Sequence, residues 1–250
     1  MSIDKIQKVY EDDEYVYKTF HSPFEAYLYA VRREDQTKKI KNSELDFGVF
    51  HKFRGLILNE LGRCDEAQYD FLESFKWNPM DLEAIFGYAD TLYKLGFYED
   101  YLKWNIDTLK NAYSNFSIAM CYHNIGRYYM AKNTKEDDMI AYNIISFSIY
   151  FEETEYAYRD LNTICERYKM PKTLAKERDI KKTIQKENLP MAPDVDLVKQ
   201  LIQIAKSFIN VNDEFALYVF RIVYNLTHDE VAKAYIEAGE KAIKEKKAKN

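Results

Sequence analysis

The sequence predicts an all-α protein built from antiparallel helical hairpins. Its clearest sign is a repeat, because LNELG at residues 58–62 returns as LYKLG at residues 92–96, a spacing of 96 − 62 = 34 residues. A period of about that length is typical of stacked helix pairs. The 250 residues also include only seven glycines and five prolines. Most of these stand at expected helix crossings or ends, and no stretch has the dense turn residues that a sheet protein requires.

Local signals predict where the helices begin. Ser22, Pro23 and Glu25 supply an N-cap, a first-turn proline and a carboxylate three residues after the cap, which together form a capping box. Thr227 and Glu230 repeat the pattern. Together with the apolar periodicity, these signals predict helices over 23–34, 43–61, 65–77, 82–95, 98–112, 115–131, 137–151, 154–169, 173–188, 194–210, 213–226 and 228–246.

The first copy of the repeat has small and aromatic residues at particular places, and the second copy keeps Ala89, Leu92 and Gly96 but has Tyr101 and Asn105 in place of the alanine and the aromatic residue. Gly55 stands where two helices of a hairpin would cross, Gly62 where the first helix ends, and Ala67 and Phe71 on the facing side of the second helix. This set resembles the tetratricopeptide repeat (TPR) family, most clearly over residues 48–113 and more weakly over 119–152. The resemblance implies a right-handed α-α superhelix of antiparallel hairpins, a TPR-like solenoid, with extra helices at the N- and C-terminal ends.

Two closely spaced prolines predict where one domain ends and the next begins. Pro190 and Pro193 interrupt the helical pattern, so we expect a TPR-like array with its N-terminal helices over 1–188 and a C-terminal helical cap packed on it over 194–250. One continuous domain is the alternative. The segment 215–226 is apolar on nearly every face and is expected to lie between the helices on either side of it. Alternatively, the apolar surface of these C-terminal helices could form the interface of a homodimer.

Composition limits which kinds of partner and which cellular compartment we expect. The net charge of −5 repels phosphate backbones, so we expect no nucleic-acid partner. The N-terminus lacks the apolar core of a signal peptide, and the longest nearly apolar run, 144–151, is too short to span a bilayer. Three scattered cysteines suggest a reduced compartment without disulfides. We therefore expect a cytoplasmic protein with no membrane association.

Catalytic motifs are absent from the sequence. It contains no phosphate-binding loop, no G-x-G-x-x-G, no H-E-x-x-H, no C-x-x-C and no G-x-S-x-G. The four histidines do not pair at helical spacing, so the sequence predicts no metal site, no cofactor and no enzyme activity. An enzyme with a carboxylate-based site remains the third alternative, since acidic residues are abundant and their convergence cannot be read from spacing.

The remaining expectation is a non-catalytic adaptor or scaffold that binds a protein or peptide. In TPR proteins the first helix of each hairpin faces a concave groove, and the resemblance implies that this groove is lined by Lys52, Asn59, Phe86, Asp90, Tyr93, Lys94, His123 and Arg127. Aromatic rings beside both signs of charge suit an extended peptide. The opposing interpretation is that the aromatic residues pack on the neighbouring hairpin. A peptide-sensing regulatory receptor of the helical-repeat type is the alternative function.

Overall fold

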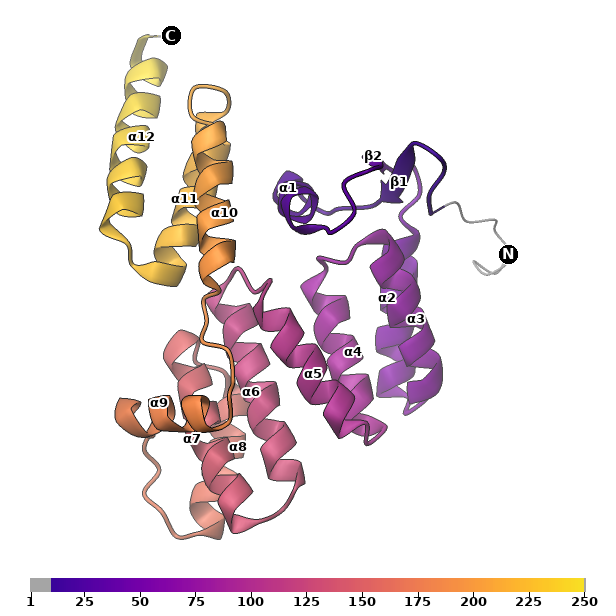
Figure 1. Cartoon of the computed structure of the whole chain (residues 1–250), viewed down its shortest axis with the longest axis vertical. Helices are drawn as coiled ribbons and strands as arrows, with labels where there is room; N and C mark the ends of the chain where they lie inside the picture. Colours follow the sequence, from indigo (N-terminus) through magenta and orange to yellow (C-terminus); the bar gives the residue numbers. More distant parts are fainter. Residues whose placement is uncertain (1–9, 250) are drawn as a thin grey trace. The chain divides into compact units, whose positions relative to one another are not determined.

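Residues 10–249 form a succession of helices with one small pair of strands (Figure 1). The computed structural model describes residues 10–249, and the all-α class predicted from the sequence is confirmed in them. Two strands, β1 (Tyr15–Lys18) and β2 (Lys39–Asn42), flank the first helix. The helices are α1 (Pro23–Arg32), α2 (Phe47–Glu60), α3 (Cys64–Trp77), α4 (Leu82–Lys94), α5 (Tyr98–Leu109), α6 (Asn115–Ala131), α7 (Lys135–Phe151), α8 (Glu155–Arg167), α9 (Glu177–Lys186), α10 (Val195–Ser207), α11 (Asp213–Thr227) and α12 (Glu230–Lys249).

Capping residues decide where these helices begin. The Ser22 hydroxyl accepts a hydrogen bond from the Glu25 amide, as the sequence predicts for the start of α1. The Glu25 carboxylate accepts from the amide of His21, the residue before the N-cap, instead of from the amide of Ser22 itself. The predicted start of α2 at residue 43 is wrong by four residues. Asp46 caps that helix through the Val49 amide, and the chain before it belongs to a loop.

The predicted cap at Thr227 is also wrong. Its hydroxyl donates to the Val223 carbonyl four residues earlier, so Thr227 is the last residue of α11. His228 follows in the left-handed conformation, with φ of 51°. Asp229 then caps α12 by accepting from the Ala232 amide. The same Thr227 hydroxyl accepts from the Asp229 amide, which lies before the start of α12, so it satisfies none of the free amides of that helix.

The two strands were not predicted. They pair in parallel with Tyr15 opposite Lys39, and α1 connects them. Each has four residues, which is too short to show alternation, and three residues of β2 are exposed. The Thr19 amide, just after β1, donates to the Trp77 carbonyl and attaches this segment to the end of α3.

The chain divides into two compact units, Met1–Tyr101 and Leu102–Asn250. They are described separately below. The domain boundary expected near Pro190 stays a prediction.

The core of the first unit lies where α2, α3 and α4 meet. The Phe71 ring of α3 is fully buried against two helical glycines, Gly55 of α2 and Gly87 of α4. A Cβ at Gly87 would stand 2.6 Å from a Phe71 ring atom, so the close crossing requires glycine there. Leu58 and Ala84 complete this cluster. The residues of the first repeat therefore pack as the sequence indicates.

Two glycines end the first helices of the hairpins. Gly62 follows α2 with φ of 73°, and Gly96 follows α4 with φ of 77°. After α2, the Gly62 amide donates to the Asn59 carbonyl and the Arg63 amide to the Leu58 carbonyl. This left-handed C-cap satisfies carbonyls that the end of the helix would leave unpaired, and it was predicted at Gly62.

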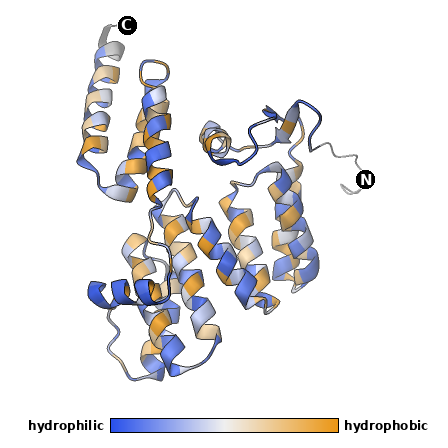
Figure 2. Cartoon of the chain, in the orientation of Figure 1, coloured by the Kyte–Doolittle hydropathy of each residue, from blue (hydrophilic) through white to orange (hydrophobic). Residues whose placement is uncertain are grey.

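The second unit is built on the hairpin α6–α7. Gly126 of α6 lets Ile145 of α7 approach closely, since a Cβ at Gly126 would clash with Ile145 Cγ1. The buried Tyr122 hydroxyl donates to the Pro190 carbonyl and accepts from the Ala192 amide. This attaches the proline-containing segment to α6. Helix α9, mostly hydrophilic in Figure 2, buries Ile180 and Ile184 and packs on α7.

The last three helices lie side by side. Helix α11 packs against α10 and against α12, so the apolar segment 215–226 does lie between its neighbours in sequence, as predicted. Its buried residues include Leu217 and Phe220, and the Phe220 ring stacks on Tyr235 of α12 with centroids 4.5 Å apart.

Candidate functional site

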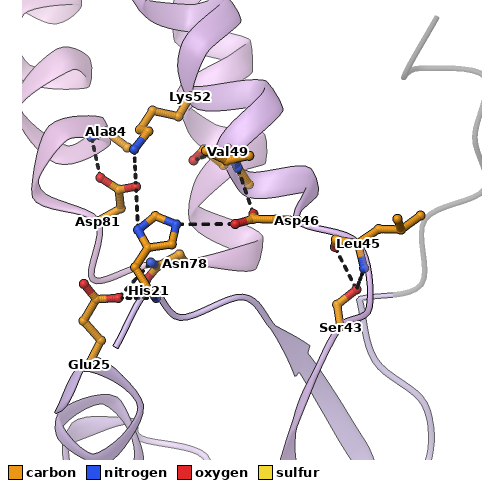
Figure 3. Close-up of polar contacts among 12 residues, drawn as sticks. His21, Glu25, Ser43, Leu45, Asp46, Val49, Lys52, Asn78, Asp81 and Ala84 are labelled. Carbon is orange, nitrogen blue, oxygen red and sulfur yellow. Dashed lines mark hydrogen bonds and ion pairs between the residues drawn. The ribbon is translucent and has the colours of Figure 1, made fainter. Parts of the chain in front are cut away.

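Two helix N-termini in the first unit share a cluster of charged side chains. Asp46 caps α2, and Asp81 caps α4 by accepting from the Glu83 and Ala84 amides at 3.0 and 3.2 Å. His21, from the segment before α1, lies between these two aspartates (Figure 3). Its Nε2 is 3.4 Å from Asp46 and its Nδ1 is 3.6 Å from Asp81.

Lys52 joins this cluster from α2. Its ammonium lies 3.0 Å from both the Asp81 and Glu83 carboxylates, and its side chain is almost fully buried. Burial alone would lower the pKa of Lys52, but the hydrogen bonds to Glu83 and Asp81 outweigh burial and raise it. We call His21, Asp46, Lys52, Asp81 and Glu83 the capping cluster. Lys52, which was expected to line the groove, therefore connects α2 to α4.

The capping cluster consists of ion pairs and helix caps. Within residues 10–249, the ring of His21 contacts two carboxylates, whereas a nucleophilic mechanism needs a hydroxyl or thiol beside the base. Histidine, cysteine and acidic residues in the same part of the chain form no group of three or more that could hold a metal ion. The contacts attach the segment before α1 to the ends of two helices.

Three of the predicted groove residues meet between α2 and α4. The Asn59 amide donates to Asp90 at 2.9 Å, and the Lys94 ammonium lies 2.9 Å from the same carboxylate. Lys94 also donates to the Asn59 carbonyl. Asn59 is buried by this packing, whereas the Asp90 and Lys94 side chains are 34 % and 37 % exposed.

Phe86 and Tyr93 belong to the same outward side of α4. Phe86, Asp90, Tyr93 and Lys94 are spaced by three or four residues and so share one side of the helix. Both rings are half-buried. The Tyr93 ring contacts those of Tyr98 and Tyr101, with centroids 5.4 and 5.2 Å apart. We call the four residues the α4 surface.

The other two predicted residues lie in the second unit. His123 of α6 is buried, with Nε2 2.9 Å from Asp160 of α8. Burial raises the pKa of Asp160, but the hydrogen bond from His123 and the charges of His123, Arg159 and Arg127 outweigh it, so that pKa is lowered. Arg127 is half-buried on α6. The pair of His123 and Asp160 connects two helices, as Lys52 does in the first unit.

A second buried histidine was not singled out by the sequence. His51 Nδ1 is 2.7 Å from Asp70 Oδ1, and Arg54 donates to both oxygens of that carboxylate from Nε and Nη2. Burial raises the pKa of Asp70, but the hydrogen bonds from His51 and Arg54 outweigh burial and lower it. This network ties α2 to α3.

Asp46 and Asp81 of the capping cluster could have been found as N-caps in the sequence, whereas the approach of His21 could not.

The arrangement defines an all-α protein of helical hairpins with polar contacts between successive helices. No family model matches the sequence, and no curated protein matches it. Among solved structures, the chain is similar to a thermophilic TPR protein of Thermus thermophilus, with a TM-score of 0.43 and 16% sequence identity over 77% of this chain and 98% of that chain. None of the helices in residues 10–249 has the length and apolar character needed to cross a membrane.

Proposed function

We propose that the chain is a non-catalytic scaffold that binds a protein or peptide segment on the α4 surface. One observation carries the proposal: an accessible pair of opposite charges, Asp90 and Lys94, stands beside two half-buried aromatic rings on one side of a helix. Charged groups can hold the ends and side chains of a peptide, and rings can hold its apolar side chains. The cytoplasmic location stays a prediction.

The predicted groove residues differ in how easily they can change partners. The pair of Asp90 and Lys94 is four residues apart on an accessible helix face, where such pairs stabilise by only about 0.3 to 0.5 kcal/mol. A ligand carboxylate can therefore pair with Lys94 while Asp90 keeps its hydrogen bond from the Asn59 amide. Lys52 and His123, in contrast, are buried with carboxylate partners, and breaking such a pair costs several kcal/mol.

The ligand chemistry follows from the order of groups along α4. Phe86 and Tyr93 are about two helical turns apart, with Asp90 between them and Lys94 after them. An extended peptide with an apolar side chain, a basic group and an acidic group fits this order. Neither the peptide-sensing receptor nor a carboxylate-based enzyme is favoured by a particular contact.

A charge swap tests this proposal. Peptides are selected from a random display library on the wild-type chain, and their affinities are measured again on a variant with Asp90→Lys and Lys94→Asp, which keeps an ion pair in place. We expect at least a tenfold loss of affinity. The matched control swaps the i,i+4 pair of α9, Glu177→Lys with Lys181→Glu, and should bind as the wild type does. Equal binding by all three chains would refute the assignment to α4.

A further inference from the structure

The small sheet of the first unit has one free edge, which belongs to β2. In a parallel ladder, every second residue of a strand bonds to its neighbour, and the residues between turn their amide and carbonyl groups to the other side. The Lys39 amide donates to the Glu14 carbonyl, and the parallel register makes Lys41 bond to β1 in the same way. Ile40 and Asn42 therefore turn their amides and carbonyls away from β1. Among residues 10–249, no other segment bonds to these outward groups.

The opposite edge of the sheet, on β1, is closed. The Tyr17 amide donates to the Tyr10 carbonyl, and the Asp12 amide donates to the Tyr15 carbonyl. The segment before β1 thus folds back along this strand and pairs with the backbone groups that β2 does not use. Three of the four residues of β2 are exposed, in contrast. The edge of β2 is therefore accessible to another strand.

We propose that the edge of β2 binds an extended acidic segment of a partner protein, which adds a strand to the sheet. Strand addition of this kind obtains affinity from main-chain hydrogen bonds and specificity from the side chains on either face. Ile40 and Asn42 offer two amides and two carbonyls, and they are two residues apart, as the alternate residues of an incoming strand require. This contact goes beyond the proposed peptide binding, since it uses no residue of the α4 surface.

The lysines of β2 determine the charge that fits this edge. Lys39 and Lys41 lie on one face of the strand and are exposed. Lys39 is paired with Glu14. The Lys41 ammonium lies 5.3 and 5.7 Å from the ring centroids of Tyr15 and Tyr17, and no carboxylate in residues 10–249 lies within ion-pair distance of it. An acidic side chain directly opposite Lys41 on the incoming strand would supply such a carboxylate, and cross-strand pairs of opposite charge stabilise a sheet.

Asp12 is an acidic residue whose charge acts on Lys41 without a direct contact. Its carboxylate is held within its own segment. Oδ1 accepts from the Glu14 and Tyr15 amides, and Oδ2 accepts from the Tyr17 hydroxyl. The ammonium of Lys41 is thus left to an acidic group of the partner.

The same lysines disfavour a second copy of the chain at this edge. An antiparallel partner must set outward residues opposite outward residues. If Ile40 faces its own counterpart, Lys39 faces Lys41 of the other copy. If Ile40 faces Asn42, Lys41 faces Lys41. Like charges directly opposite one another destabilise a strand pair, and lysines on an edge strand protect against self-association. An acidic strand meets no such repulsion.

Fluorescence anisotropy tests the proposal with a short labelled peptide that alternates valine with glutamate. The full-length wild type should bind it, and should bind a peptide with lysine in place of glutamate about tenfold more weakly. Asn42→Pro removes an outward amide at a place where an edge strand tolerates proline. It should weaken binding about tenfold with the circular dichroism spectrum unchanged. The matched control Asn42→Ala keeps the amide and should bind as the wild type does. Lys41→Glu should remove the preference for the glutamate peptide.

Hydrogen exchange locates the bound peptide. Saturation with the glutamate peptide should slow exchange of the Ile40 and Asn42 amides, and the charge swap at Asp90 and Lys94 should leave the affinity unchanged. A wild type that does not bind, equal binding by Asn42→Pro and Asn42→Ala, or unchanged exchange at both amides would overturn the proposal. Loss of binding in the charge-swap variant would also overturn it, because the peptide would then lie on the α4 surface.

Discussion

The crossing of α2, α3 and α4 at Phe71 makes a specific prediction for Gly87→Ala. The added Cβ would stand 2.6 and 2.8 Å from two atoms of the Phe71 ring and 3.2 Å from Leu56 Cδ2. The ring has little room to move toward α2, because it packs directly on the backbone at Gly55. Both α2 and α4 therefore contact the ring.

The change in the free energy of unfolding caused by Gly87→Ala is the balance of two contributions. Forcing an extra carbon into a packed core costs about 1 to 3 kcal/mol. Alanine is a better helix former than glycine by about 1 kcal/mol, which offsets part of that cost. Two ring atoms lie closer than 3.0 Å to the added Cβ, so the cost falls in the upper part of that range, at about 2 to 3 kcal/mol. We therefore expect Gly87→Ala to lower the free energy of unfolding by about 1 to 2 kcal/mol. Urea denaturation followed by circular dichroism measures this difference.

A second substitution separates the clash from other causes. In a Phe71→Leu background the ring is gone, so the same Gly87→Ala change should be neutral or stabilising. This double-mutant cycle isolates the contact between the two residues. A Gly87→Ala chain as stable as the wild type, or an equal cost in both backgrounds, would refute the packing at this crossing.

Two further predictions concern buried polar contacts. Asp70→Asn should cost about 2 kcal/mol at pH 7, because it weakens the pairing with His51 and Arg54. Since the pKa of Asp70 is lowered in the folded chain, its stabilisation is full above the unfolded pKa of about 4 and is lost as the pH falls through the folded value. Urea titrations at several pH values should therefore show wild type and variant converging in acid, and a constant difference would contradict this. Tyr122→Phe should cost about 1 to 2 kcal/mol by leaving the Pro190 carbonyl and Ala192 amide without the hydroxyl. Limited proteolysis should then cleave near Ala192 faster, and unchanged cleavage would argue against the attachment.

The 34-residue repeat allowed the core of the first hairpins to be predicted. Gly55 and Phe71 are a crossing glycine and a filling aromatic residue, and Gly62 is a left-handed cap, as the spacing indicates. These features depend on local backbone geometry and on one neighbouring helix. Both are encoded within a few tens of residues, so sequence reasoning reaches them.

How deeply the predicted site residues are buried could not be predicted from the sequence. The repeat register gives the side of a helix on which Lys52 or His123 lies, but burial depends on the packing of Asp81 and Asp160 from other helices. The approach of His21 to two capping aspartates likewise depends on how the segment before α1 folds back. Strands of four residues left no alternation to detect. The line of Phe50, Phe53, Ile57 and Leu61 was visible in the sequence, but only the structure reveals that it is exposed.

A crystal structure of the whole chain with a selected peptide tests the proposed scaffold function most directly. We expect peptide side chains against the rings of Phe86 and Tyr93 and charged peptide groups beside Asp90 and Lys94. Lys52 and His123 should keep their contacts with Asp81 and Asp160. A peptide bound elsewhere, with the pair of Asp90 and Lys94 unchanged and accessible to solvent, would contradict the proposal.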